Sequence, residues 1–230
     1  FLHTWAARLD AHGYPSTRDE RTLRFRDYDG LQLELVAADE RSGDEASGRG
    51  RGNPPLRAEH PEVPAEHAIL GPEGARAYGV FHNVEEKLLT ETLGFTWLGG
   101  GEYRLDGEER HFHWAYDPAD HYGEPGAGTV HHIAWATPNE EQDAWRRRAD
   151  AGGAHVTPII DRFWFKSIYF REPSGVLFEI ATLGPGFSVD EDPAHLGESL
   201  VLPPKFEPLR DRIEATLTPI ENPRTAKAHS

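Results

Sequence analysis

The feature that most constrains the fold is an order of structural elements that recurs along the chain. In residues 80–116, the pattern predicts a strand over 80–84, a helix, and three further strands. Residues 129–182 repeat this order, with the helix over 139–151. Residues 1–36 carry part of it, a helix followed by two strands. Two full copies and one partial copy of a β-α-β-β-β unit predict an α+β fold that arose by internal duplication.

The repeat divides the chain into four parts. We expect a partial module over residues 1–36, a connection over 37–78, a domain of two paired modules over 79–183, and a tail over 184–230. The connection is rich in Gly, Pro, Glu and Arg and shows little periodicity. The first copy lacks its opening strand, and the chain begins with Phe1 and contains no methionine. These observations predict that an N-terminal module is missing from the sequence as given.

Composition and charge narrow the classes of partner. The net charge of −15 argues against nucleic acid, because phosphate binding needs a clustered basic surface. No run approaches the roughly 18 apolar residues of a membrane span, and the N-terminus lacks the pattern of a secretory signal. We therefore expect a soluble, cytoplasmic protein with no membrane partner. The absence of cysteine leaves His, Asp and Glu as the strong metal ligands.

Two potential metal ligands lie on predicted strands at opposite ends of the last repeat. His132 begins an alternating apolar run, and Glu179 stands between Phe178 and Ile180, where an unpaired carboxylate would be costly to bury. A divalent cation shared with a neutral imidazole would compensate that charge, and two histidines plus one carboxylate hold non-haem Fe(II). The alternatives are a core histidine and a cross-strand charge pair. The joint placement on the first and last strands of one unit favours metal ligation.

Four segments carry a resemblance to a known family: residues 130–135, 161–173, 175–182, and the tail from 184 to 204. They resemble the vicinal-oxygen-chelate superfamily of glyoxalases, bleomycin-resistance proteins and extradiol dioxygenases, and most closely its dioxygenases that cleave hydroquinone rings. The resemblance implies modules that pair into cupped mixed sheets around a metal.

The same resemblance implies a ligand set. Members of this kind have four modules and hold the metal with a His from the first module and a His and a Glu from the fourth. His132 and Glu179 match the fourth-module ligands, and the first module has no counterpart in this chain. His82 is an alternative third ligand, because it opens the predicted third module at a place equivalent to His132.

The activity implied by the resemblance is extradiol-type ring cleavage. The substrates would be a hydroquinone or a related dihydroxylated aromatic and dioxygen, and the metal would be Fe(II), Mn(II) or another divalent ion. One alternative is a glyoxalase-like isomerase or lyase that uses the metal as a Lewis acid. Another is a metal-free protein of the same fold that binds an aromatic compound. A homo-oligomer is compatible with each.

Three residues are candidates for catalytic roles beside the metal. His131 could act as an acid or base towards the substrate, or be a structural histidine bonded to backbone. Tyr169 could donate a hydrogen bond to a bound oxygen or a ring hydroxyl, or simply pack. Arg162 could stabilise an anionic substrate, or pair with Asp161 or a nearby carboxylate.

Two further groups of residues have both a functional and a structural interpretation. His111, His113 and His121 could form a second metal site, although solvent-exposed histidines are the favoured interpretation. Aromatic residues near the proposed site could line a substrate pocket or belong to the core, and these are Trp135, Phe163, Trp164 and Phe165.

Overall fold

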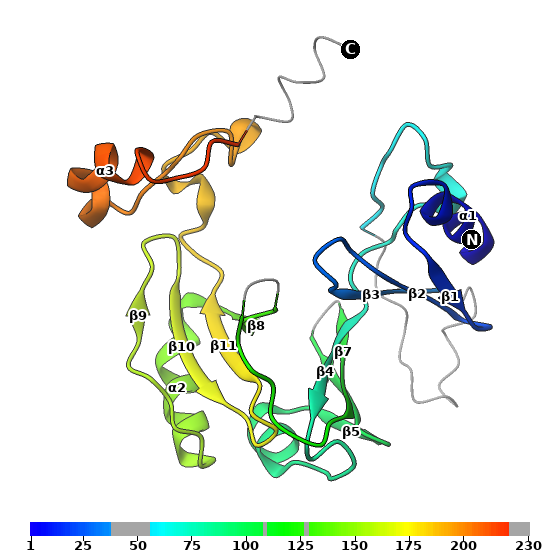
Figure 1. Ribbon diagram of the computed structural model, residues 1–230. Coiled ribbons are helices and arrows are strands. Elements are labelled where there is room, and N and C mark those ends of the chain that lie inside the picture. Colours follow the sequence, from blue (N-terminus) through cyan, green and yellow to red (C-terminus); the bar gives the residue numbers. More distant parts are fainter. Residues whose placement is uncertain (38–55, 108–109, 127–128, 221–230) are drawn as a thin grey trace. The chain divides into compact units, whose positions relative to one another are not determined.

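The computed structural model describes residues 1–37, 56–107, 110–126 and 129–220 (Figure 1). It divides into two compact units. The first comprises residues 1–133, 151–154 and 171–177, and the second comprises residues 134–150, 155–170 and those from 178 onwards.

The first unit begins with a helix and a three-stranded antiparallel meander. Their bounds are α1 Leu2–Ala11, β1 Ser16–Arg18, β2 Thr22–Arg26 and β3 Gln32–Val36. Leu23 on β2 is fully buried, and the indole of Trp5 donates to the carbonyl oxygen of His67 at 2.8 Å. The predicted helix and two strands are confirmed, and β1 is a short strand that the pattern did not predict.

The first unit also contains a complete β-α-β-β-β module. Its strands are β4 Gly74–Gly79, β5 Thr96–Gly99, β6 Glu102–Asp106 and β7 His111–Pro118, in the order β4-β7-β6-β5. β4 runs parallel to β7, and the other pairs are antiparallel. A helical turn over Leu88–Leu93 buries its three leucines and ends at Gly94, whose φ of 83° suits glycine. Tyr103 and Trp114 are among the residues that form the core of this module.

The opening strand of this module lies earlier than expected. Residues 80–83 form a turn, so the predicted strand over 80–84 is wrong. The opening strand is instead β4, and most of it falls inside the expected connection. Residues 38–55 of that connection lie outside the described residues. Its sequence, Gly-Ala-Arg-Ala-Tyr-Gly, lacks the alternating large apolar residues that identify a strand. His82 therefore follows the strand, and Glu73, which directly precedes it, holds the position expected for His82.

The second unit contains the second full module. Its strands are β8 Ile133–Thr137, β9 Ile160–Asp161, β10 Lys166–Arg171 and β11 Leu177–Thr182, in the order β8-β11-β10-β9. A helical turn over Asn139–Glu141 leads into α2, Gln142–Ala151. The Gln142 side chain donates to the carbonyl oxygen of Ile180 on β11 at 2.9 Å. Each module thus orders its strands first, fourth, third, second, which confirms the α+β fold of repeated modules and the two mixed sheets.

The described part of the tail, residues 184–220, contains short helical segments. They span Phe187–Val189, Pro193–His195, Pro204–Leu209 and α3 Arg210–Glu214. Arg210 bonds the carboxylates of Glu207 and Glu214 at 2.7 and 3.0 Å. Within the part of the chain that the structure describes, no helix has the length and apolar character needed to cross a membrane.

Candidate functional site

Glu179 is a buried carboxylate at the third position of β11. Its residue is 3% exposed, and its neighbours Phe178 and Ile180 belong to the apolar core. Oε1 accepts a hydrogen bond from the Tyr169 hydroxyl at 2.7 Å and another from the Ser167 hydroxyl. Both donors lie on β10, the sheet neighbour of β11. These bonds compensate part of the cost of burying the carboxylate.

Tyr169 links Glu179 to the guanidinium group of Arg162. Its hydroxyl oxygen accepts a hydrogen bond from Nη2 of Arg162 at 3.2 Å, and the guanidinium carbon lies 5.5 Å from the centre of the phenol ring. Arg162 is exposed, whereas Tyr169 is half-buried. The structure thus brings three of the predicted site residues into one chain of polar contacts. Ser167 is a fourth member that the sequence did not identify, because a serine on a buried strand has no distinctive pattern.

The loop between β9 and β10 holds Arg162 and carries a strained residue. Phe163 has a φ of 77°, which is uncommon for a residue other than glycine. Its N–H donates to Oδ1 of Asp161 at 2.8 Å, and the N–H of Arg162 donates to the carbonyl oxygen of Phe165 at 2.9 Å. These two bonds hold the turn, so Asp161 serves the backbone of the loop. Strained backbone of this kind is frequent at binding and catalytic sites.

The aromatic residues of this region divide between the core and the tail. The ring of Trp135 packs against Phe178 with centroids 5.5 Å apart. The indole of Trp164 donates to Oδ1 of Asp190 at 2.8 Å, and its ring lies 6.1 Å from that of Phe187. The loop that carries Arg162 is therefore tied to the beginning of the tail.

His131 and His132 lie directly before β8. His131 is exposed and His132 is half-buried. Their rings are perpendicular with centroids 5.2 Å apart, and their Nδ1 atoms are separated by 2.9 Å. β8, which His132 directly precedes, is the sheet neighbour of β11. The two histidines belong to the first unit, and Glu179 belongs to the second.

Glu172 is a second buried carboxylate, and it lies in the first unit. It is 2% exposed and accepts hydrogen bonds from the Tyr116 hydroxyl at 2.7 Å, the N–H of Ser174 at 2.8 Å and the N–H of Val176 at 2.6 Å. Burial raises the pKa of Glu172 above its ordinary value, although the three donors oppose this. Burial also raises the pKa of Tyr116, so its hydroxyl remains a donor. No pattern in the sequence identifies Glu172 as a candidate, since it begins a Glu-Pro-Ser-Gly segment.

Glu73, His111 and His113 form a group whose ligand atoms all lie within 4.8 Å of one another. Oε1 of Glu73 is 3.8 Å from Nε2 of His111 and 3.6 Å from Nε2 of His113. The side chains of the two histidines are 9% and 22% exposed, so the solvent-exposed interpretation is wrong for both. It holds for His121, which is exposed and is not a member of the group.

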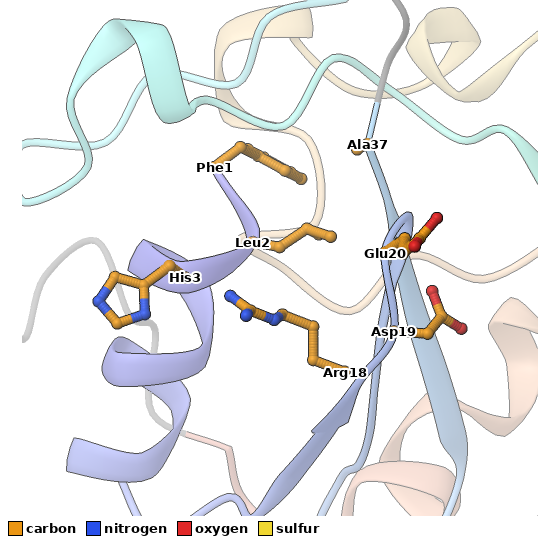
Figure 2. A pocket seen from close by; sticks show the side chains of 7 residues that line it. All are labelled: Phe1, Leu2, His3, Arg18, Asp19, Glu20 and Ala37. Carbon is orange, nitrogen blue, oxygen red and sulfur yellow. The ribbon is translucent and has the colours of Figure 1, made fainter.

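A pocket of about 440 Å³ lies between the start of α1 and the β1–β2 turn (Figure 2). Its lining residues are Phe1, Leu2, His3, Arg18, Asp19, Glu20 and Ala37. The Asp19 carboxylate accepts from the Thr22 hydroxyl and from the N–H groups of Arg21 and Thr22, which lowers its pKa to about 2. Asp19 therefore serves the turn, and the pocket contains none of the candidate site residues.

Comparison with known proteins places the chain in a family. The model of the Glyoxalase/Bleomycin resistance protein/Dioxygenase superfamily matches residues 87–180. A protein of Bacillus subtilis (strain 168) named "Putative ring-cleaving dioxygenase MhqO" is 38% identical over 226 residues, which are 94% of this chain and 69% of that protein. The chain belongs to the glyoxalase/bleomycin resistance protein/dioxygenase superfamily. The family resemblance seen in the sequence is thereby confirmed.

Two further proteins are similar to this chain. A crystal structure titled as a putative dioxygenase from Bacillus subtilis is 34% identical, has a TM-score of 0.77, and covers 96% of this chain and 70% of its own. The "Chlorohydroquinone/hydroquinone 1,2-dioxygenase" of Sphingobium indicum is 34% identical over 116 residues, which are 49% of this chain and 33% of that enzyme.

Proposed function

We propose that this superfamily member is a metal-dependent dioxygenase that cleaves the ring of a hydroquinone or a related dihydroxylated aromatic. The observation that carries the proposal is the contact chain Arg162–Tyr169–Glu179, in which a buried carboxylate, a phenol and a cation lie together on one module. The names of the relatives, which include a ring-cleaving dioxygenase and a hydroquinone dioxygenase, supply the reaction class.

His132 and Glu179 are the proposed metal ligands from this chain. The donor set fits a divalent metal, because a buried carboxylate and a neutral imidazole are ligands that non-haem Fe(II) accepts. Fe(II) is the proposed ion, and Mn(II) is the alternative ion for the same ligands. When bound, the metal would supply the redox chemistry with dioxygen and a Lewis-acid contact to the ring oxygen. His82 does not hold the position expected of a third ligand, because it follows the first strand of its module.

The protein groups have separate proposed roles around that metal. Tyr169 holds Glu179 in one orientation through its hydroxyl. The same hydroxyl can donate to a substrate oxygen instead of to Glu179. Arg162 offers N–H donors and positive charge to a deprotonated ring hydroxyl. His131, beside the proposed ligand and exposed, is the candidate that accepts or returns the hydroxyl proton.

Oxygen consumption tests the proposed reaction. Purified protein reconstituted anaerobically with Fe(II) should consume dioxygen when hydroquinone is added and yield a ring-opened product. Glu179→Gln should abolish this uptake, whereas Glu140→Gln, at an exposed position on the turn before α2, should leave it unchanged. Turnover of a hemithioacetal without oxygen uptake would instead identify an isomerase. Binding of the aromatic compound without either reaction would identify a binding protein.

A further inference from the structure

We propose that the chain has a second metal site, which lies in the first unit and is formed by Glu73, His111 and His113. It is distinct from the proposed site of His132 and Glu179, and it suits Zn²⁺ or a similar borderline divalent cation. This site goes beyond the proposed dioxygenase activity and does not depend on it. It is complete within one module, because all three ligands come from β7 and from the residue that precedes β4.

The backbone positions the three side chains. His111 and His113 are two residues apart on β7, so strand alternation places both on one face of the sheet. Their ring centroids are 5.2 Å apart. The parallel pairing of β4 and β7 sets Gly74 opposite His113, and the N–H of His113 donates to the carbonyl oxygen of Glu73 at 3.0 Å. Glu73 is thereby fixed next to His113, at the end of the sheet where the parallel strands β4 and β7 begin.

The distances suit one ion. Ligand atoms that share a metal at bond lengths of about 2.1 Å lie at most about 4.2 Å apart. The two distances from Oε1 of Glu73, 3.6 and 3.8 Å, already satisfy this limit. All the ligand atoms lie within 4.8 Å of one another, so a small side-chain rotation completes the set. The sheet holds the largely buried imidazoles, and the carboxylate, 51% exposed, leaves the ion a route from solvent.

The two modules place ligands at equivalent positions. Glu73 directly precedes the first strand of its module, as His132 directly precedes β8. His113 is the third residue of the last strand of its module, as Glu179 is the third residue of β11. In both modules these two strands are neighbours. Both modules thus have one carboxylate and one imidazole at these two positions. The carboxylate precedes the first strand in one module and lies on the last strand in the other. His111 adds a third ligand.

The ligand types indicate the class of metal. Two imidazoles and one carboxylate, with no thiolate, suit Zn²⁺ with a fourth position open to water, and they also suit Co²⁺ and Ni²⁺. Mg²⁺ and Ca²⁺ prefer sites made of oxygen ligands. One ligand directly precedes β4 and the other two lie on β7. A bound ion would therefore link these two parallel strands and stabilise the folded module by mass action.

Zn²⁺ titration tests this site separately from the proposed dioxygenase site. The parent is His132→Ala/Glu179→Gln, which lacks the proposed ligands of the fourth module. After chelator treatment and dialysis, calorimetry should find one Zn²⁺ bound per chain, and Co²⁺ should give a visible absorption band that Zn²⁺ removes. Adding His113→Ala should weaken Zn²⁺ binding by at least about 100-fold, since even outer-shell partners of a metal are worth about 10–100-fold.

Controls separate lost ligands from lost structure. His121→Ala, at an exposed histidine near the end of β7 and outside the group, should bind Zn²⁺ as the parent does. Glu73→Gln changes a half-exposed side chain and keeps the test valid if His113→Ala fails to fold. A parent that binds no Zn²⁺ would overturn the proposal, as would equal affinity in the parent and Glu73→Gln. The dioxygenase proposal would survive either result, because its ligands are already absent from the parent.

Discussion

The hydroxyl of Tyr169 donates to Oε1 of Glu179 at 2.7 Å, from the strand next to the one that carries the carboxylate. The same hydroxyl accepts from Arg162, so the phenol connects an exposed guanidinium to a buried acid. Tyr169 can therefore act on Glu179 by fixing its rotamer, and on a ligand by presenting its own hydroxyl. Its removal should affect both stability and catalysis.

Tyr169→Phe should lower the free energy of unfolding by about 1–2 kcal/mol, because Glu179 loses the hydroxyl donor of Tyr169 while the ring remains in place. Urea unfolding monitored by tryptophan fluorescence measures this change. In the reconstituted protein, the turnover number for hydroquinone should fall more than the affinity for Fe(II). A variant with unchanged stability and unchanged turnover would show that the contact serves neither purpose.

The unfolding free energy should depend on pH through Glu172. Burial raises its pKa in the folded protein above the unfolded value, so the folded state binds more protons between the two pKa values. The stabilisation is complete below the unfolded pKa, about 4.5, and is lost as the pH rises through the folded pKa. Glu172→Gln should flatten this decline by up to about 1.4 kcal/mol per pH unit. Urea unfolding at several pH values measures the slope, and Glu85→Gln, at an exposed carboxylate, should leave it unchanged.

Gly74→Ala should disturb the pairing of β4 with β7. A Cβ at Gly74 would collide with the carbonyl oxygen and Cβ of His113, and backbone cannot move aside cheaply. The expected loss of stability is about 1–3 kcal/mol, typical of overpacked sites. Zn²⁺ binding should weaken as well, because Glu73 and His113 depend on this pairing. Gly123→Ala is the matched control, since its Cβ would meet nothing within 4 Å and its stability should change by less than about 0.5 kcal/mol.

The sequence predicted those parts of the fold and site that have a pattern. Apolar runs bounded by turn residues predict the repeated order of elements. They also predict β11 with Glu179 and β10 with Tyr169. β4 was missed because four of its six residues are glycine or alanine, and it packs by close backbone approach instead of by large side chains. Glu73 was missed for the same reason, since its role depends on the register of a strand that the pattern did not reveal.

Metal content should separate the proposed iron site from the second site. In a His113→Ala background, which removes a ligand of the second site, the reconstituted protein should retain Fe(II) after desalting. Adding His132→Ala or Glu179→Ala should lower the iron content by about 10-fold or more, because each removes a direct ligand and even outer-shell losses cost about 10–100-fold in affinity. Elemental analysis by mass spectrometry measures the content, and circular dichroism checks that each variant is folded. Iron content that is unchanged in both folded variants would mean that neither residue is a ligand, and the dioxygenase proposal would then fail.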